Sequence, residues 1–276
     1  MIILLVLLII FILLELYTLL LSCRRGHGAW KYLKLWRYAH RGYHDKPQVP
    51  ENSMAAFRRA ADNHFGAELD VHLMRDGHLA VIHDSNLKRT AGVDVAVEDL
   101  TVEELKQYRL EGTDETIPLL EEVLPLFEGK SPLIVELKSE RGNYDELTQA
   151  TAELLDRYSV LYCIESFDPR CLRWLKKNRP EIVRGQLSGN LLRDGQGSDQ
   201  SKATLFLLSH LLLNFMGKPD FIAYNCLDRS NWSLQWCRKF YKVQEISWTL
   251  RSKEELQRVE ADGCLSIFET FDPRGV

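Results

Sequence analysis

Residues 1–21 form an almost unbroken apolar stretch, and shorter apolar segments alternating with amphipathic ones follow it along the chain. Eight short apolar or β-branched segments predict strands, and stretches with the apolar spacing of helices separate most of them. The predicted strands lie at residues 36–40, 67–72, 133–137, 160–165, 182–186, 221–224, 243–248 and 264–268. The predicted helices lie at residues 53–63, 144–158, 169–178, 202–215, 230–240 and 253–259.

Strands that alternate with helices are typical of a parallel sheet, and eight of them predict an α/β protein with a (β/α)8, or TIM, barrel. Such barrels have about 250 residues, which matches the chain after its apolar stretch. Residues 79–83 predict a further strand, and residues 86–126 form a long excursion with a helix at 102–108. We therefore expect a small insertion after the second strand. An open doubly wound sheet is the alternative, but no glycine-rich dinucleotide turn follows the first strand.

The N-terminal apolar stretch is long enough for a helix that crosses the roughly 30 Å hydrocarbon layer of a membrane. A signal peptide is the alternative, but no basic residue precedes the stretch, which is also longer than the usual apolar region of a signal peptide. Five basic residues follow it and favour a cytoplasmic catalytic domain: Arg24, Arg25, Lys31, Lys34 and Arg37. We divide the chain into a transmembrane anchor at 1–22, a basic juxtamembrane linker at 23–35 and a barrel domain at 36–276, with its insertion at about 86–126.

Composition narrows the class of function. The net charge of −4 gives no basic field, so nucleic acid is not an expected partner. The six cysteines are scattered, without the close pairing typical of zinc sites, and we expect free thiols.

Imidazole and carboxylate side chains lie at the C-terminal ends of the predicted strands, where TIM barrels carry their active sites. His40 ends the first strand and Glu136 lies near the end of the third. Glu68 and Asp70 are two residues apart on the second strand, so they face the same side. Buried charges cost several kcal/mol, roughly, unless they are paired or bound to a metal ion. Together with His83, these residues can hold a hard metal ion and transfer protons, which indicates an enzyme.

A series of short motifs extends from residue 38 to the C-terminal region. The motifs are His40-Arg41-Gly42, Pro50-Glu51-Asn52-Ser53, Glu68-Leu69-Asp70-Val71, His83-Asp84, Glu136-Leu137-Lys138, Ser166-Phe167-Asp168-Pro169 and Trp248-Thr249. Each motif alone is weakly specific, but the ordered set resembles the glycerophosphodiester phosphodiesterase family. The resemblance implies a TIM barrel with a small insertion after the second strand. It also implies metal-dependent hydrolysis of glycerophosphodiesters to sn-glycerol 3-phosphate and an alcohol.

The resemblance also implies roles for individual residues. Glu68, Asp70 and Glu136 match the metal ligands, and an all-oxygen set favours Mg²⁺ or Ca²⁺ over zinc. His40 and His83 match the general acid and base, without indicating which histidine is which. An imidazole suits both tasks because its ordinary pKa of about 6.5 lies near the working pH.

Phosphate recognition involves a second group of residues. Arg41 matches a phosphate contact, and its planar guanidinium suits a bidentate grip on phosphate oxygens. Lys138 matches a second cationic contact. Trp248 is expected to line the substrate pocket, although packing in the core explains it equally well. Glu269 follows the last strand, and its equivalence to an acidic residue of the family stays open. Among the other histidines, His72 is the best placed to face the barrel mouth.

Other functions remain open from the sequence. A lysophospholipase D acting on lysophospholipids would use the same site, and it is favoured if residues 205–215 line the pocket. This apolar run is too short to cross a bilayer, and it is either an outer barrel helix or a helix that dips into lipid. A non-catalytic membrane-binding protein is a third possibility. A glycosidase using Glu136 and Glu269 would leave both histidines unexplained. The sequence leaves the oligomeric state open.

Overall fold

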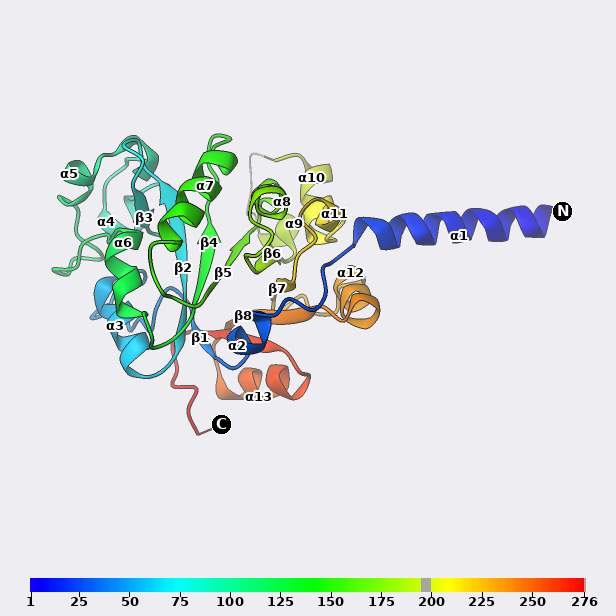
Figure 1. Cartoon of the computed structure of the whole chain (residues 1–276). Coiled ribbons are helices and arrows are strands. Elements are labelled where there is room, and N and C mark those ends of the chain that lie inside the picture. The colour runs from blue at the N-terminus through cyan, green and yellow to red at the C-terminus, as the bar shows by residue number, and fades with distance from the viewer. Residues whose placement is uncertain (195–199, 276) are drawn as a thin grey trace.

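The strands of the computed structural model, which describes residues 1–194 and 200–275, lie where the sequence pattern predicts them (Figure 1). The barrel strands are β1 (Tyr38–Ala39), β2 (Gly66–Leu73), β4 (Leu133–Leu137), β5 (Tyr162–Ser166), β6 (Arg184–Ser188), β7 (Phe221–Asn225), β8 (Gln244–Leu250) and β9 (Leu265–Phe268). Each strand pairs in parallel with the next, and β9 pairs with β1. The sheet therefore closes into the predicted eight-stranded barrel.

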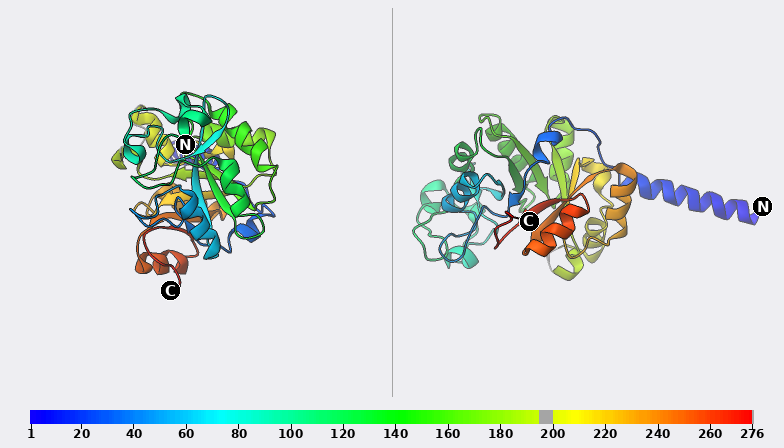
Figure 2. Two further views of the ribbon diagram at one scale, coloured as in Figure 1. Left: turned by 90° about the vertical axis from the view of Figure 1, so that its left-hand side faces the viewer. Right: turned by 90° about the horizontal axis from the view of Figure 1, so that it is seen from below.

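The predicted helices cover the outside of the barrel (Figure 2). They are α3 (Met54–Asp62), α7 (Tyr144–Leu155), α8 (Pro169–Asn178), α10 (Lys202–Ser209), α11 (Asn214–Gly217), α12 (Trp232–Trp236) and α13 (Lys253–Ala261). The Ser53 side chain caps α3 by accepting a hydrogen bond from the backbone of Ala56. Shorter helical segments are α2 (Trp30–Leu33), α9 (Leu191–Asp194) and the π-helical turn η3 (Cys237–Tyr241).

Two predicted helices differ from the structure. The single helix expected at 202–215 is divided into α10 and α11, because Leu211 has a left-handed backbone (φ 58°) and is buried against Ile222 and Tyr224. The helix expected at 102–108 is a single turn, α5 (Val102–Leu105), which begins with a capping box at Thr101.

The insertion packs around a small core of its own. β3 (Leu79–Val81) pairs antiparallel with β2, so the expected extra strand is present and extends β2 as a hairpin. The rest contains α4 (Lys88–Ala91), η1 (Val97–Asp99), α5, α6 (Leu120–Val123) and η2 (Leu124–Leu126). Its buried side chains include Met74, Leu87, Val97, Leu105 and Ile117. The insertion thereby holds the segment that carries His83 beside the barrel mouth.

α1 (Ile2–Leu20) projects away from the barrel, and it is long and apolar enough to span a membrane by length and composition (Figure 1). A signal sequence meets the same criterion. The helix has a mean hydropathy of 3.0, and no residue within it is buried. Its last turns contact the barrel domain: Tyr17 hydrogen-bonds Ser233, and the Tyr241 hydroxyl donates to the Thr18 carbonyl. Leu21, directly after the helix, is completely buried.

Candidate active site

Strand alternation on β2 separates an apolar outer face from an acidic inner one. Leu69 and Val71 pack in the core beneath the helices, whereas Glu68 and Asp70 are at most 2% exposed within the barrel. In the parallel register, Asp70 lies opposite Glu136 of β4. Glu136 in turn lies opposite Glu165 of β5, which extends the acidic layer across three strands.

Three of these carboxylates form a compact cluster. One oxygen from each of Glu68, Asp70 and Glu136 lies within 4.8 Å of the others. Burial and the neighbouring carboxylates raise the pKa of Glu68, and burial raises the pKa of Glu136 to about 7. Burial opposes ionisation of Asp70 too, but the charge of Lys138 and the other positive and hydrogen-bonding neighbours together outweigh it and keep the pKa of Asp70 low. The cluster therefore holds more negative charge than its protein partners balance.

The donor set fits a divalent cation. Asn52 donates from Nδ2 to Asp70 Oδ2 at 2.8 Å, while its own Oδ1 is buried and lacks a hydrogen-bond partner among the described residues. The same holds for Oε2 of Glu165. Hard carboxylate and amide oxygens are the ligands that such cations prefer. A bound cation would allow the carboxylates to be ionised together, so these residues could hold a divalent ion.

In both predicted histidines, Nδ1 forms a hydrogen bond with a carboxylate. His40 Nδ1 lies 2.6 Å from Glu269 Oε2, and His83 Nδ1 lies 2.6 Å from Asp84 Oδ1. A neutral imidazole that donates from Nδ1 has Nε2 free to accept a proton. Nε2 of His40 is 4.0 Å from Glu68, at the edge of the carboxylate cluster.

Burial also sets the charge of the two imidazoles. It lowers the pKa of His40 to about 4, although the hydrogen bond that His40 donates to Glu269 works in the opposite direction. Burial, followed by the charge of Lys138, lowers the pKa of His83. His40 is therefore neutral at neutral pH, the state that a proton acceptor requires.

The predicted phosphate contacts lie at the same mouth. Lys138 Nζ is 2.9 Å from Asp70 Oδ1 and 2.6 Å from Glu136 Oε1. The Arg41 guanidinium donates to Glu51 at 2.8 Å, and the Arg41 backbone N–H donates to Glu68 at 3.0 Å. Two permanent cations thus border the carboxylate cluster, as recognition of an anionic group requires.

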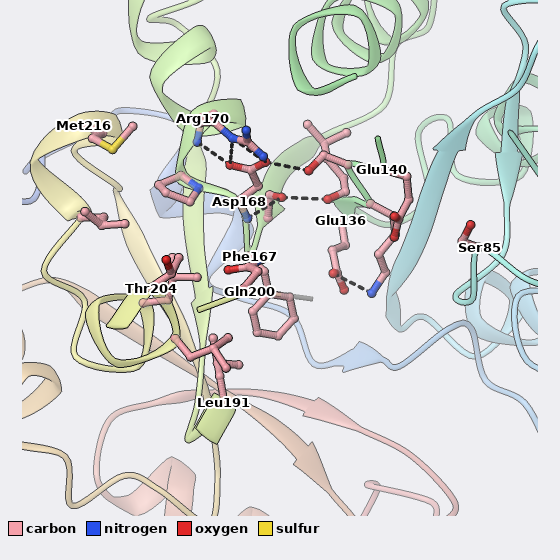
Figure 3. A pocket seen from close by; sticks show the side chains of 18 of the residues that line it. Ser85, Glu136, Glu140, Phe167, Asp168, Arg170, Leu191, Gln200, Thr204 and Met216 are labelled. Carbon is pink, nitrogen blue, oxygen red and sulfur yellow. Dashed lines mark hydrogen bonds and ion pairs between the residues drawn. The ribbon is translucent and has the colours of Figure 1, made fainter. Parts of the chain in front are cut away.

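Two adjoining cavities open at this mouth. The smaller has a volume of about 190 Å³ and is lined by all the predicted site residues except Asp70, which lies in contact with Lys138. The larger has a volume of about 840 Å³ and shares four lining residues with the smaller: His83, Glu136, Lys138 and Phe167. Figure 3 shows Phe167 between Glu136 and a distant wall that includes Leu191, Thr204 and Met216. The predicted residues are therefore brought together, while their individual roles stay predictions.

Trp248 lies in the wall of the smaller cavity. Its ring meets Phe167 edge-on at a centroid distance of 5.9 Å. The side chain therefore both packs against a neighbour and borders the cavity, which is compatible with the two explanations that the sequence left open.

His72 does not face the mouth. Its Nδ1 lies 2.6 Å from Glu98, and its Nε2 lies 3.2 Å from the backbone carbonyl of His83. Both ring nitrogens thus form hydrogen bonds away from the mouth, one with Glu98 and one with the backbone of His83. These bonds connect β2 to the segment that carries His83.

Sequence reasoning assigned no role to Asp84 or Glu165 and left that of Glu269 open. The adjacency of His83 and Asp84 was a signal for the first. The position of Glu165 at the end of a predicted strand was a signal for the second.

Comparisons with known proteins agree with this geometry. Residues 40–223 match the profile of the glycerophosphoryl diester phosphodiesterase family. A glycerophosphodiester phosphodiesterase of Caldanaerobacter subterraneus subsp. tengcongensis is 38% identical over 246 residues, covering 85% of this chain and 93% of that protein. A lysophospholipase D of Rattus norvegicus is 39% identical over 123 residues, covering 39% of this chain and 37% of that protein.

Among solved structures, a phosphodiesterase of Oleispira antarctica in complex with the product sn-glycerol-3-phosphate has the same fold. Its TM-score is 0.69 at 24% identity, covering 89% of this chain and 95% of that one. The extent of the sequence match and the shared barrel lead to one assignment: the chain belongs to the glycerophosphoryl diester phosphodiesterase family and is a phosphoric diester hydrolase.

Proposed function

We propose that this protein hydrolyses glycerophosphodiesters to sn-glycerol 3-phosphate and an alcohol at the mouth of its barrel, with Mg²⁺ or Ca²⁺ as cofactor. The observation that carries the proposal is the pair of imidazoles, each held at Nδ1 by a carboxylate, beside three clustered buried carboxylates. Two histidines next to an oxygen-rich cation site provide proton transfer and charge stabilisation together.

Charge stabilisation is the task of the cationic groups. A phosphodiester carries one negative charge, which repels an attacking nucleophile and increases in the transition state. Arg41 and Lys138 would hold the phosphate and favour the more highly charged transition state. A divalent cation held by Glu68, Asp70 and Glu136 would supply further electrostatic stabilisation of the phosphate oxygens.

Proton transfer is the task of the two histidines. One imidazole takes the proton of the attacking hydroxyl at Nε2, from either water or the substrate's own glycerol 2-hydroxyl. The other donates a proton to the oxygen of the leaving alcohol as its bond to phosphorus breaks. Attack by the 2-hydroxyl gives a cyclic phosphate, which water then opens. Such positioned proton transfer contributes roughly 10²–10⁴-fold to the rate.

The test is release of glycerol 3-phosphate from glycerophosphocholine by the wild type and by His40→Ala, each with and without a chelator. We expect a loss of roughly 10² or more from either treatment. His78→Ala is the matched control, because His78 lies on the insertion surface and contacts Glu121. Activity that survives both the substitution and the chelator contradicts the proposed mechanism.

Metal binding has a test that is independent of turnover. Mg²⁺ or Ca²⁺ should raise the melting temperature of the wild type, because a ligand that binds only the folded state stabilises it by about 2.7 kcal/mol at a hundred times its dissociation constant. Glu68→Gln should abolish this shift, and Glu121→Gln should keep it. Equal shifts in the wild type and Glu68→Gln would exclude the cation site.

The larger cavity favours a second candidate, lysophospholipase D activity at the same site. Its distant wall includes Leu205, Leu208, Leu213 and Met216, the apolar lining that an acyl chain requires. Each buried methylene contributes about 0.8 kcal/mol, so kcat/KM for monomeric lysophosphatidylcholines should rise about fourfold per methylene while the cavity fills. A kcat/KM that does not depend on acyl length would exclude this candidate and leave glycerophosphodiester hydrolysis standing.

We also propose that α1 is a single membrane span with the barrel on the cytoplasmic side. The support is a helix of 19 residues with a mean hydropathy of 3.0, followed by five basic residues between positions 24 and 37. Membrane extraction and N-terminal sequencing test this proposal together. A mature chain that lacks residues 1–21 would identify a signal sequence instead.

A further inference from the structure

Large apolar side chains are exposed in one region of the barrel domain. In the described chain after α1, those classed as exposed are Tyr32, Leu35 and seven residues between positions 192 and 240. We call the seven the apolar rim: Leu192, Phe206, Leu207, Phe215, Leu227, Trp232 and Phe240. Trp232 is 84% exposed and Leu227 is 69% exposed. Isolated exposed apolar residues are ordinary, but a group of this kind marks an interaction surface.

Part of the rim lies around the base of α1. The rim residues belong to α9, α10, α11, the β7–α12 loop, α12 and η3, and the last four of these lie on the side of the domain from which α1 projects (Figure 1). Direct contacts fix this arrangement. The Tyr17 ring meets Trp236 of α12 edge-on at a centroid distance of 5.5 Å, and Tyr17 also hydrogen-bonds Ser233. A membrane that holds α1 would therefore lie against the same side of the domain.

The charge of this region matches an anionic leaflet. Residues 201–242 contain six basic residues and two acidic ones, in a chain whose net charge is −4. The basic residues are Lys202, Lys218, Arg229, Arg238, Lys239 and Lys242. Basic residues close to an anionic membrane surface are attracted to it and strengthen binding. Arg229 and Arg238 form ion pairs with Glu245 and Asp262, so the four lysines are the main source of attraction.

α10 lies between the larger cavity and the exterior. Leu205 and Leu208 line the cavity and are each 8% exposed, whereas Phe206 is 47% exposed and Leu207 is 36% exposed on the outside. One short helix thus presents apolar side chains both to the cavity and to the exterior.

We propose that the apolar rim rests in the same leaflet that anchors α1, and that α10 is the entrance through which lipid substrate passes from the bilayer into the larger cavity. This inference rests on the proposed lysophospholipase activity and on the membrane span. The partner that we propose for the rim is the interfacial region of an anionic bilayer. Substrate then passes from the bilayer to the active site without crossing bulk water.

The first test uses the full chain in vesicles of phosphatidylcholine and phosphatidylglycerol. In Phe206→Glu/Leu207→Glu, we expect turnover of vesicle-bound lysophosphatidylcholine to fall tenfold or more, because two charges face the lipid. Turnover of water-soluble glycerophosphocholine should not change, because neither side chain lines a cavity. Leu35→Glu is the matched control, since Leu35 is 75% exposed outside the rim.

The outcomes separate the two proposals. A wild type inactive on both substrates refutes the proposed function. A wild type that turns over both, with a double variant equally active on vesicles, refutes the rim as an entrance while leaving the function intact. A second measurement does not depend on activity: brominated phosphatidylcholine should quench tryptophan fluorescence less in Trp232→Phe than in Trp36→Phe. Equal quenching in the two variants shows that the rim does not touch the bilayer.

Discussion

We propose that Glu269 positions His40 rather than reacting with substrate. It accepts the Nδ1 hydrogen bond at 2.6 Å and is itself held by Arg251 at 2.7 Å, so the imidazole is fixed with Nε2 toward Glu68. In Glu269→Gln, we expect kcat to fall by about 10² with KM little changed, because the imidazolium loses its counter-charge. The hydrogen bond and charge of Glu269 raise the pKa of His40, so the acid limb of the pH profile should move to lower pH. Steady-state kinetics across pH measure both effects.

Asp272→Asn is the control for this experiment. It removes a carboxylate from the same C-terminal segment, one that pairs with Arg274. A Glu269 variant with a raised KM and an unmoved pH profile would assign Glu269 a structural role instead.

Site residues were easier to predict from the sequence when the residues they contact lie close by in the chain. His40, Glu68 and Asp70 were identifiable because motif order and two-residue alternation are local properties of the chain. Glu269 was left open because it is 229 positions away from His40 and reaches it only when β9 pairs with β1 to close the barrel. The sequence pattern alone does not indicate which carboxylate will contact which ring nitrogen once β9 pairs with β1.

Within the insertion, the pair of His72 and Glu98 joins β2 to η1. Burial opposes ionisation of Glu98, but the hydrogen bond and charge of His72, together with the Ser85 hydrogen bond, outweigh it and lower the pKa of Glu98 below its ordinary 4.5. A carboxyl group with a lowered pKa in the folded state stabilises the fold above its unfolded pKa, and this stabilisation is lost as the pH falls. Wild type should therefore lose stability as the pH falls below about 4.5.

Glu98→Gln should be about 1–3 kcal/mol less stable than wild type at pH 7, and this difference should shrink under acid conditions. Urea unfolding at both pH values measures it, with Glu103→Gln on the surface of the same insertion as the control. A deficit that is equal at both pH values would mean that the ion pair does not contribute to the stability.

The barrel strands and the insertion were predictable, because the apolar pattern of the strands and the length of the segment between them can be read from the sequence without knowledge of tertiary contacts. The division between α10 and α11 was not. Residues 205–215 contain neither glycine nor proline, so no local signal interrupts the helical pattern. Burial of Leu211 against the β7 side chains Ile222 and Tyr224 favours a break that the local sequence does not.

Across the whole molecule, the junction between α1 and the barrel is built into the fold. Sequence reasoning treated the basic residues after the span only as determinants of topology. In the structure Arg24 donates from Nε to Asp220 at 2.6 Å and also contacts the carbonyls of Pro180 and Ile182. Arg37 is likewise paired with Glu260. Arg24 thus ties the segment after α1 to the barrel, whereas Arg37 ties the start of β1 to α13. Composition alone cannot indicate either role.

A rigid junction is what would hold the apolar rim against the bilayer, and Asp220→Asn tests its rigidity. The asparagine keeps an acceptor for the Arg184 backbone N–H but removes the charge that binds Arg24. We expect trypsin to cleave the full-length variant after Arg24 about ten times faster than wild type, because breaking a charge-assisted pair costs about 1.5–3 kcal/mol. Asp262→Asn, which removes a partner of Arg229 and Arg238, is the control and should be cleaved at the wild-type rate. Equal cleavage of all three proteins would mean that burial of Leu21, rather than the ion pair, holds α1 in place.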